Sequence, residues 1–117
     1  MGKTYDRLDD TLIGFIKAQK MFFVATAPLS GDGHVNVSPK GYDSFAVIDE
    51  TTVAWLDLGG SGIETMAHLK ENGRITIMFC AFEGTPNILR LQGRGEVLAP
   101  GDDDYASLLT RFPSLPG

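Results

Sequence analysis

The chain has 117 residues, of which 43% are hydrophobic and 21% are charged. That length suits one domain, and that composition is typical of a packed globular protein and argues against disorder. The formal charge of −5 disfavours nucleic acid as a partner, because a polyanion is bound by a clustered basic surface. We therefore expect a single domain over residues 1–117 with no nucleic-acid partner.

The two ends of the chain give further indications. The N-terminal residues lack the apolar stretch of a signal peptide, and no segment approaches the roughly 20 apolar residues that span a bilayer. We therefore expect a cytoplasmic protein with no membrane partner. Residues 112–117 end abruptly after a helix-like segment, which indicates a C-terminus that has been cut short.

The content of cysteine and histidine excludes several kinds of site. One cysteine, Cys80, can form no disulfide framework and no thiolate metal cluster, and its apolar surroundings in the sequence predict a buried side chain. The two histidines, His34 and His68, lie in no metal-binding motif. We expect no metal site. Signatures of hydrolases and of nucleotide triphosphatases are also absent.

The first predicted elements are a helix and a hairpin. Between residues 6 and 20 the apolar residues recur at three- and four-residue spacing, which predicts an amphipathic helix. Residues 21–27 are rich in β-formers, and the turn at residues 30–33 leads into a second strand at residues 34–40. These two strands are predicted to pair as a hairpin.

The returning strand of this hairpin alternates strictly. One face of the strand is predicted to hold Val35, Val37 and Pro39. The other face is predicted to hold the polar residues His34, Asn36, Ser38 and Lys40. Pro39 has no N–H to donate to a neighbouring strand, so we expect this strand to lie at a sheet edge or to contain a bulge. A ligand could approach the backbone there.

Further strands are predicted at residues 45–48, 52–58, 74–82 and 88–98. Six strands joined mostly by short turns suit a small antiparallel barrel. A crossover helix is predicted at residues 63–72, closed by Gly73. The apolar members of its stripe Ile63, Met66, Ala67 and Lys70 are predicted to face the barrel, while Thr65 and His68 lie to the side. A last helix is predicted at residues 102–112.

The glycine-rich junction before the crossover helix is the predicted anion site, because exposed N–H groups and the positive end of the helix dipole meet there. Ser61 can cap the helix, bind a phosphate, or do both. The Thr65 hydroxyl can reach the same anion or bond to a preceding carbonyl. Lys40 is the nearest predicted positive charge. A second polar row on the strand at residues 88–98 consists of Arg90, Gln92 and Arg94.

Several of these segments carry a family resemblance through their order and spacing. They are Asn36-Val37-Ser38-Pro39-Lys40-Gly41, Trp55-Leu56-Asp57-Leu58, the glycine-rich turn, Thr65-Met66-Ala67-His68-Leu69-Lys70-Glu71-Asn72-Gly73-Arg74 and Leu91-Gln92-Gly93-Arg94-Gly95-Glu96. Between about residues 6 and 100 the chain resembles the pyridoxamine 5'-phosphate oxidase-like family of FMN-binding split barrels. The resemblance implies a mainly β fold, a six-stranded antiparallel split β-barrel with an N-terminal helix, a short crossover helix and a C-terminal helix.

The resemblance also implies a homodimer with FMN at the subunit interface, and an oxidoreductase acting on an unidentified small molecule. The cofactor-binding residues that it implies are Asn36, Val37, Ser38, Lys40, Trp55, Leu56, Asp57, Ser61, Gly62 and Thr65. No catalytic acid or base is assigned.

One departure from the family bears on the substrate. The oxidases that give the family its name carry an Arg-Lys pair in the phosphate-binding stretch, where this chain has Ile63-Glu64-Thr65. Oxidation of pyridoxamine 5'-phosphate itself is therefore disfavoured, and phosphate binding would depend on Lys40, the helix N-terminus or an arginine of the second subunit. The alternative function is a non-catalytic module that binds flavin, a deazaflavin or haem as a sensor, carrier or store.

Overall fold

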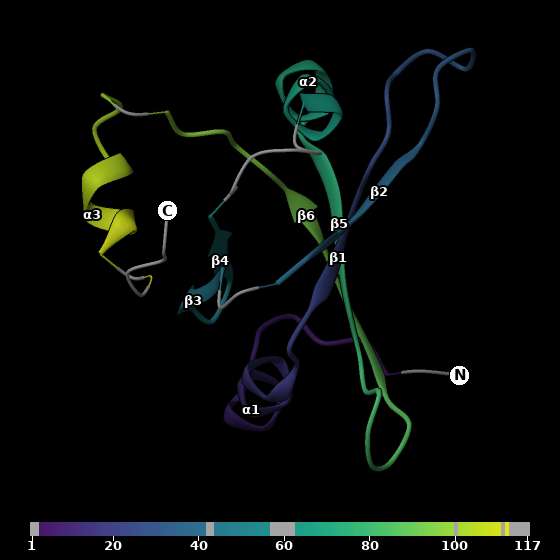
Figure 1. The fold of residues 1–117 in the computed structure, drawn as a ribbon, viewed down its shortest axis with the longest axis vertical. Helices are drawn as coiled ribbons and strands as arrows, with labels where there is room; N and C mark the ends of the chain where they lie inside the picture. The colour runs from purple at the N-terminus through teal and green to yellow at the C-terminus, as the bar shows by residue number, and fades with distance from the viewer. Residues whose placement is uncertain (1–2, 42–43, 57–62, 100, 111, 113–117) are drawn as a thin grey trace.

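The computed structural model describes residues 3–41, 44–56, 63–99, 101–110 and 112. These residues form six strands and three helices (Figure 1). In chain order the elements are α1 (Asp10–Ala18), β1 (Phe22–Thr26), β2 (Asn36–Lys40), β3 (Phe45–Asp49), β4 (Thr52–Trp55), α2 (Ile63–Asn72), β5 (Arg74–Cys80), β6 (Ile88–Arg94) and α3 (Tyr105–Leu109). The predicted order of helices and strands is confirmed.

The strands form two antiparallel sheets. The larger sheet has the order β2-β1-β5-β6, and the smaller sheet pairs β3 with β4. In the predicted β1–β2 hairpin, Val24 lies opposite Ser38 and Thr26 lies opposite Asn36. β2 is an edge strand of the larger sheet, as Pro39 predicts. The fold is therefore mainly β, with six antiparallel strands among the described residues.

The hydrophobic core lies between one face of the larger sheet and the smaller sheet. Val24 and Phe79 are fully buried there. The ring centroid of Phe79 lies 5.0 Å from that of Phe45 on β3 and 5.7 Å from that of Phe22 on β1. These aromatic contacts join the two sheets, and Ile16 of α1 packs into the same cluster. We call this covered side of the larger sheet its inner face.

α1 begins later than the periodicity of the sequence predicts. The side chain of Asp9 accepts a hydrogen bond from the backbone N–H of Leu12 at 2.8 Å and so caps the helix at its first turn. The helix ends at Ala18. Its apolar stripe still packs against the core, as predicted, so the shift changes the helix boundary and not its function in packing.

α2 ends where the sequence predicts, but a different side of it meets the sheet. Gly73 follows the helix with φ of 73°, a conformation that glycine adopts without strain. Met66 is 37% exposed and Ala67 is exposed, whereas Thr65 is 3% exposed and forms a hydrogen bond to β2. The prediction that Met66 and Ala67 face the sheet is therefore wrong, because hydrogen-bond partners on the hairpin orient the helix by its polar side.

The other face of the larger sheet, its outer face, carries exposed apolar side chains. Val37 of β2 is 61% exposed and Ile88 of β6 is 56% exposed. Cys80, which register places on the same face, is half-buried rather than buried as predicted, because the core contacts lie on the inner face. Among the described residues, no helix combines the length and the apolar character that crossing a membrane requires.

Candidate functional site

The predicted polar face of β2 exists and is turned inward. Asn36 and Lys40 are half-buried, and Ser38 between them is only 3% exposed. Val37 points to the outer face, where 61% of its surface is exposed. Polar and apolar side chains thus alternate along β2 as predicted, but the polar side chains are the covered ones and Val37 is exposed.

The structure brings together two predicted site residues from distant segments. Asn36 on β2 donates a hydrogen bond from Nδ2 to the Thr65 hydroxyl oxygen on α2, at 3.0 Å. In this contact the hydroxyl acts as acceptor, so its own proton remains available for a second bond. Thr65 lies in the first turn of α2, and the edge of β2 and the N-terminal end of α2 therefore form one polar corner.

Ser38 supplies the most informative atom of this corner. Its Oγ is buried and has no hydrogen-bond partner among the described residues. Leaving a buried hydroxyl unpaired costs about 1–3 kcal/mol, and most buried polar side-chain atoms in native proteins have a partner. A ligand with an acceptor atom at this position would remove that cost. The Ser38 hydroxyl therefore fits a binding group better than a core residue.

Lys40 lies at the opposite end of the same strand. It is four residues beyond Asn36, which corresponds to about 13 Å along an antiparallel strand. Its Cα partner is Phe22 at the start of β1, whereas that of Asn36 is Thr26 at the end of β1. A compact anion held beside Asn36 would not also contact the backbone around Lys40. An extended ligand lying along the edge of β2 could contact both ends.

The second predicted polar row is not part of this corner. Arg90, Gln92 and Arg94 are exposed on β6, at the other edge of the larger sheet from β2. Register places their side chains on the outer face, because Gln92 lies opposite Thr76 and Thr76 opposite Ala25. Within one subunit, these residues are therefore separated from Ser38 by both the sheet and its width.

The remaining predicted site residues lie on or after β4. Trp55 pairs with Phe45 on β3 and packs against the hydrophobic core. The backbone N–H of Leu56 donates to the carbonyl oxygen of Ser44 at 2.7 Å. Asp57, Ser61 and Gly62 lie outside the described residues, as does the glycine-rich turn at residues 59–62.

Two hollows of about 400 Å³ each occur among the described residues, and the predicted site residues line neither of them. The first includes Val35 and Arg74 at one end of the larger sheet. The second lies between α1 and β3 and includes Lys20, Phe22 and Gly41. The polar corner is thus part of neither of these two hollows.

One polar contact near the corner was not predicted from the sequence. Thr26 is 3% exposed on the inner face of β1, and its Oγ1 lies 2.9 Å from Nδ1 of His68 on α2. The sequence does contain a signal for this contact. The inward-facing positions of β1 hold Phe22, Val24 and Thr26, so a threonine occupies a position that is typical of a core residue. A hydroxyl in that place requires a partner from the covering element.

The chain is similar to proteins of one known family. The family model described as pyridoxamine 5'-phosphate oxidase matches residues 8–113. The pyridoxamine 5'-phosphate oxidase family protein ustO of Aspergillus flavus is 48% identical over 110 residues, which cover 92% of this chain and 44% of that protein. The chain thus spans less than half the length of this relative. No solved structure matches the chain. The match of the family model over most of the sequence, together with this identity, shows that the chain belongs to the pyridoxamine 5'-phosphate oxidase family.

Proposed function

We propose that this chain binds FMN and acts as a flavin-dependent oxidoreductase on a small molecule. Membership of the pyridoxamine 5'-phosphate oxidase family suggests a flavin-binding, oxidoreductase-type function. The observation that carries the proposal is the buried Ser38 Oγ, which has no partner among the described residues. It lies on the same face of β2 as Asn36, whose amide already contacts α2.

The residues of the corner fit the polar parts of such a cofactor. Ser38 and Thr65 each have a hydroxyl proton to donate, and Lys40 adds a positive charge further along the edge of β2. Each charge-assisted hydrogen bond contributes about 1.5–3 kcal/mol, so three of them supply a large part of the roughly 8 kcal/mol of micromolar binding. The extended form of FMN, with a ring at one end and a phosphate at the other, suits a site spread along a strand. When bound, the flavin would supply the hydride chemistry.

Pyridoxamine 5'-phosphate is not the substrate that we propose. The stretch Ile63-Glu64-Thr65 lacks the Arg-Lys pair that the resemblance associates with that activity. Fewer fixed positive charges leave the phosphate of the cofactor more dependent on the hydroxyl groups of the corner. Lys40, about 13 Å away along β2, would contact another part of an extended cofactor. The substrate is an unidentified small molecule.

The proposed active form is a homodimer in which the two sheets of each subunit form a split barrel. Val37 and Ile88 expose 61% and 56% of their surfaces on the outer face of the larger sheet, and Val35 next to β2 exposes 68%. Val37 and Ile88 lie at the two opposite edges of this face, and exposed apolar side chains favour burial against another surface. A second copy of the chain at this face would bury these side chains, and Arg90 lies on the same face.

A titration with FMN tests the proposed function. Wild-type protein is expected to shift the flavin absorption spectrum and to change its fluorescence at micromolar concentrations. Lys40→Ala is expected to weaken binding, whereas Lys20→Ala, which removes an exposed lysine outside the corner, is not. Protein that leaves the FMN spectrum and fluorescence unchanged would contradict the proposal, and equal affinity in both variants would remove Lys40 from the site.

A second measurement separates an enzyme from a non-catalytic binding module. The flavin-loaded protein is reduced, and its reoxidation by oxygen is then followed by absorbance. The oxidised protein is mixed with a reduced nicotinamide cofactor in the reverse experiment. Exchange at a catalytic rate in either direction supports the oxidoreductase, and slow exchange in both directions favours a sensor, carrier or store.

A further inference from the structure

The face of α2 that meets the larger sheet is held by polar contacts. Four hydrogen bonds join α2 to the β1–β2 hairpin. Three come from one stripe of the helix, and they are Asn36 Nδ2 to Thr65 Oγ1 (3.0 Å), Thr26 Oγ1 with His68 Nδ1 (2.9 Å) and Asn72 Nδ2 to the Ala27 carbonyl oxygen (2.8 Å). The fourth runs from the backbone N–H of Leu29 to Glu71 Oε1 (2.6 Å). Thr65, His68 and Asn72 are spaced by three and four residues, so they share one stripe of the helix. The helix therefore lies on the hairpin in one register.

These contacts determine where the helix lies more strictly than apolar packing would. Hydrophobic burial is non-directional, whereas a hydrogen bond depends on both distance and angle. A shift of the helix by one residue moves it by about 1.5 Å and turns it by about 100°. Such a shift would break all three bonds. Among the described side chains of α2, Leu69 is the buried apolar residue, at 7% exposed.

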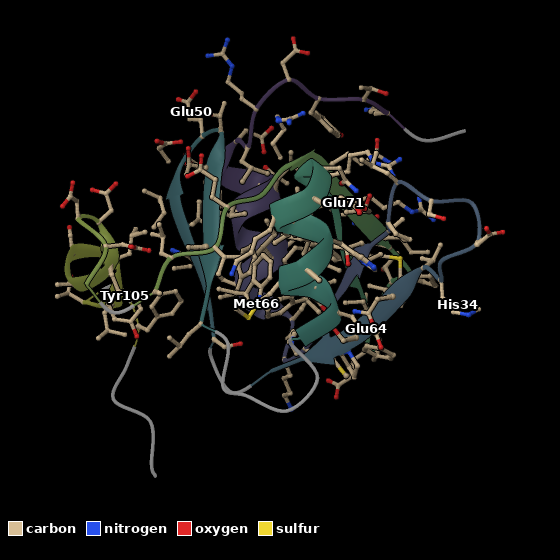
Figure 2. All side chains as sticks on the ribbon, turned by 90° about the horizontal axis from the view of Figure 1, so that it is seen from above. His34, Glu50, Glu64, Met66, Glu71 and Tyr105 are labelled. Atoms are coloured by element: carbon tan, nitrogen blue, oxygen red, sulfur yellow. The ribbon has the colours of Figure 1, made fainter. Side chains whose placement is uncertain are left out.

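The stripe leads along α2 to the polar corner. Asn72 contacts the chain just after β1 and His68 contacts the end of β1, while Thr65 contacts the edge strand β2. The N-terminal end of α2 is thus the end nearest Ser38. Figure 2 shows Glu64 at the end of the helix beside β2 and Glu71 towards its other end.

We infer that His68 and Asn72 are positioning residues for the phosphate end of the proposed cofactor. Neither of them is among the predicted cofactor-binding residues. Their bonds hold α2 so that the Thr65 hydroxyl and the first turn of the helix lie at Asn36, two residues from Ser38 on the same face of β2. The Ser38 Oγ has no partner among the described residues. This inference rests on the proposed function, because it assigns these residues to the site that binds FMN.

A comparison of FMN with riboflavin isolates the phosphate end, because the two molecules differ only in the phosphate group. Wild-type protein is expected to bind FMN more tightly than riboflavin. His68→Leu removes the ring nitrogen Nδ1 that bonds to Thr26. It is expected to lower FMN affinity by about tenfold, the effect of losing one charge-assisted hydrogen bond, while riboflavin affinity changes less than about twofold. His68→Asn keeps a polar atom near the position of Nδ1 and is expected to restore much of the preference for FMN.

Two further variants keep the test decisive. Thr26→Val breaks the same bond from the sheet side with almost no change in volume, and it replaces His68→Leu if that variant does not fold. Met66→Ala changes an exposed side chain of the same helix and is the matched control. A preference for FMN that stays at the wild-type value in His68→Leu and Thr26→Val would overturn this inference alone. Wild-type protein that binds no FMN would overturn the proposed function and this inference together.

Discussion

Replacement of Ser38 by alanine is expected to stabilise the ligand-free protein and to weaken FMN binding. The Ser38 Oγ is buried without a partner among the described residues, and its removal relieves a desolvation cost of about 1–3 kcal/mol. The proteins differ by one oxygen atom, so little space is left behind. We take about 1 kcal/mol as the expected gain in the free energy of unfolding. For a chain of 117 residues this corresponds to an increase in Tm of about 4 °C.

The matched control is Thr26→Val. Thr26 is also 3% exposed on the inner face, but its hydroxyl is bonded to His68 at 2.9 Å. Its removal leaves a ring nitrogen of His68 without a partner, which costs about 1–2 kcal/mol and lowers Tm by about 4–8 °C. Two neighbouring hydroxyls of equal burial are therefore expected to have effects of opposite sign.

The change in Tm is measured by thermal unfolding of the ligand-free variants, followed by circular dichroism. The change in FMN affinity is measured by flavin titration. Ser38→Ala is expected to weaken FMN binding by about tenfold, since the lost hydrogen bond contributes about 1.5 kcal/mol. A Tm that falls in Ser38→Ala as far as in Thr26→Val would show that the Ser38 hydroxyl is satisfied within the protein. Unchanged FMN affinity would show that it does not contact the cofactor. Either result would refute the reasoning from the unpaired atom.

Three other predictions concern the dimer, the packing of α2 and the response to pH. Val37→Glu places a charge on the exposed outer face of the larger sheet and is expected to convert the proposed dimer to a monomer, as measured by light scattering. A variant that has the mass of a dimer at the same concentrations as the wild type would contradict the proposed interface. In Gly95→Ala the new Cβ would lie 2.9 Å from a methyl carbon of Leu69, so we expect Tm to fall by about 4–8 °C through overpacking, and an unchanged Tm would show that α2 adjusts freely. A hydrogen bond from the backbone N–H of Thr51 holds the pKa of Asp49 below its usual value of 3.8. The stability that this hydrogen bond contributes is therefore present above pH 3.8 and is lost as the pH falls through the lowered pKa. An NMR titration of the Asp49 carboxyl is expected to give a midpoint below 3.8, and a midpoint at or above 3.8 would contradict this account.

Much of the architecture was predictable because it depends on neighbouring residues. The three-residue and four-residue periodicity predicted α1 and α2, and alternation with turn residues predicted the β1–β2 hairpin. Gly73 predicted the end of α2, because its positive φ is a local property of the backbone. The resemblance to the pyridoxamine 5'-phosphate oxidase family was confirmed by the match of the family model over residues 8–113.

The candidate site was predictable only in part. The sequence placed Asn36, Ser38 and Lys40 on one face of a strand, and the structure agrees. It did not indicate that Thr65 of α2 contacts the end of β2 opposite to Lys40, because the position of α2 along β2 depends on tertiary contacts. Asp57, Ser61 and Gly62 remain predictions, since the structure does not describe them.

The sequence by itself determined the order of the elements, the alternation within each strand and the membership of a family. Only the tertiary structure decided which face of each element is covered. Val37 is exposed and Ser38 is buried, and α2 meets the sheet through Thr65 rather than Met66. The physical reason is that backbone periodicity depends on residues a few positions apart, whereas burial depends on which surface packs against an element from elsewhere in the chain. Here that surface brought hydrogen-bond partners for Asn36 and Thr26, and among the described residues it brought none for the Ser38 hydroxyl.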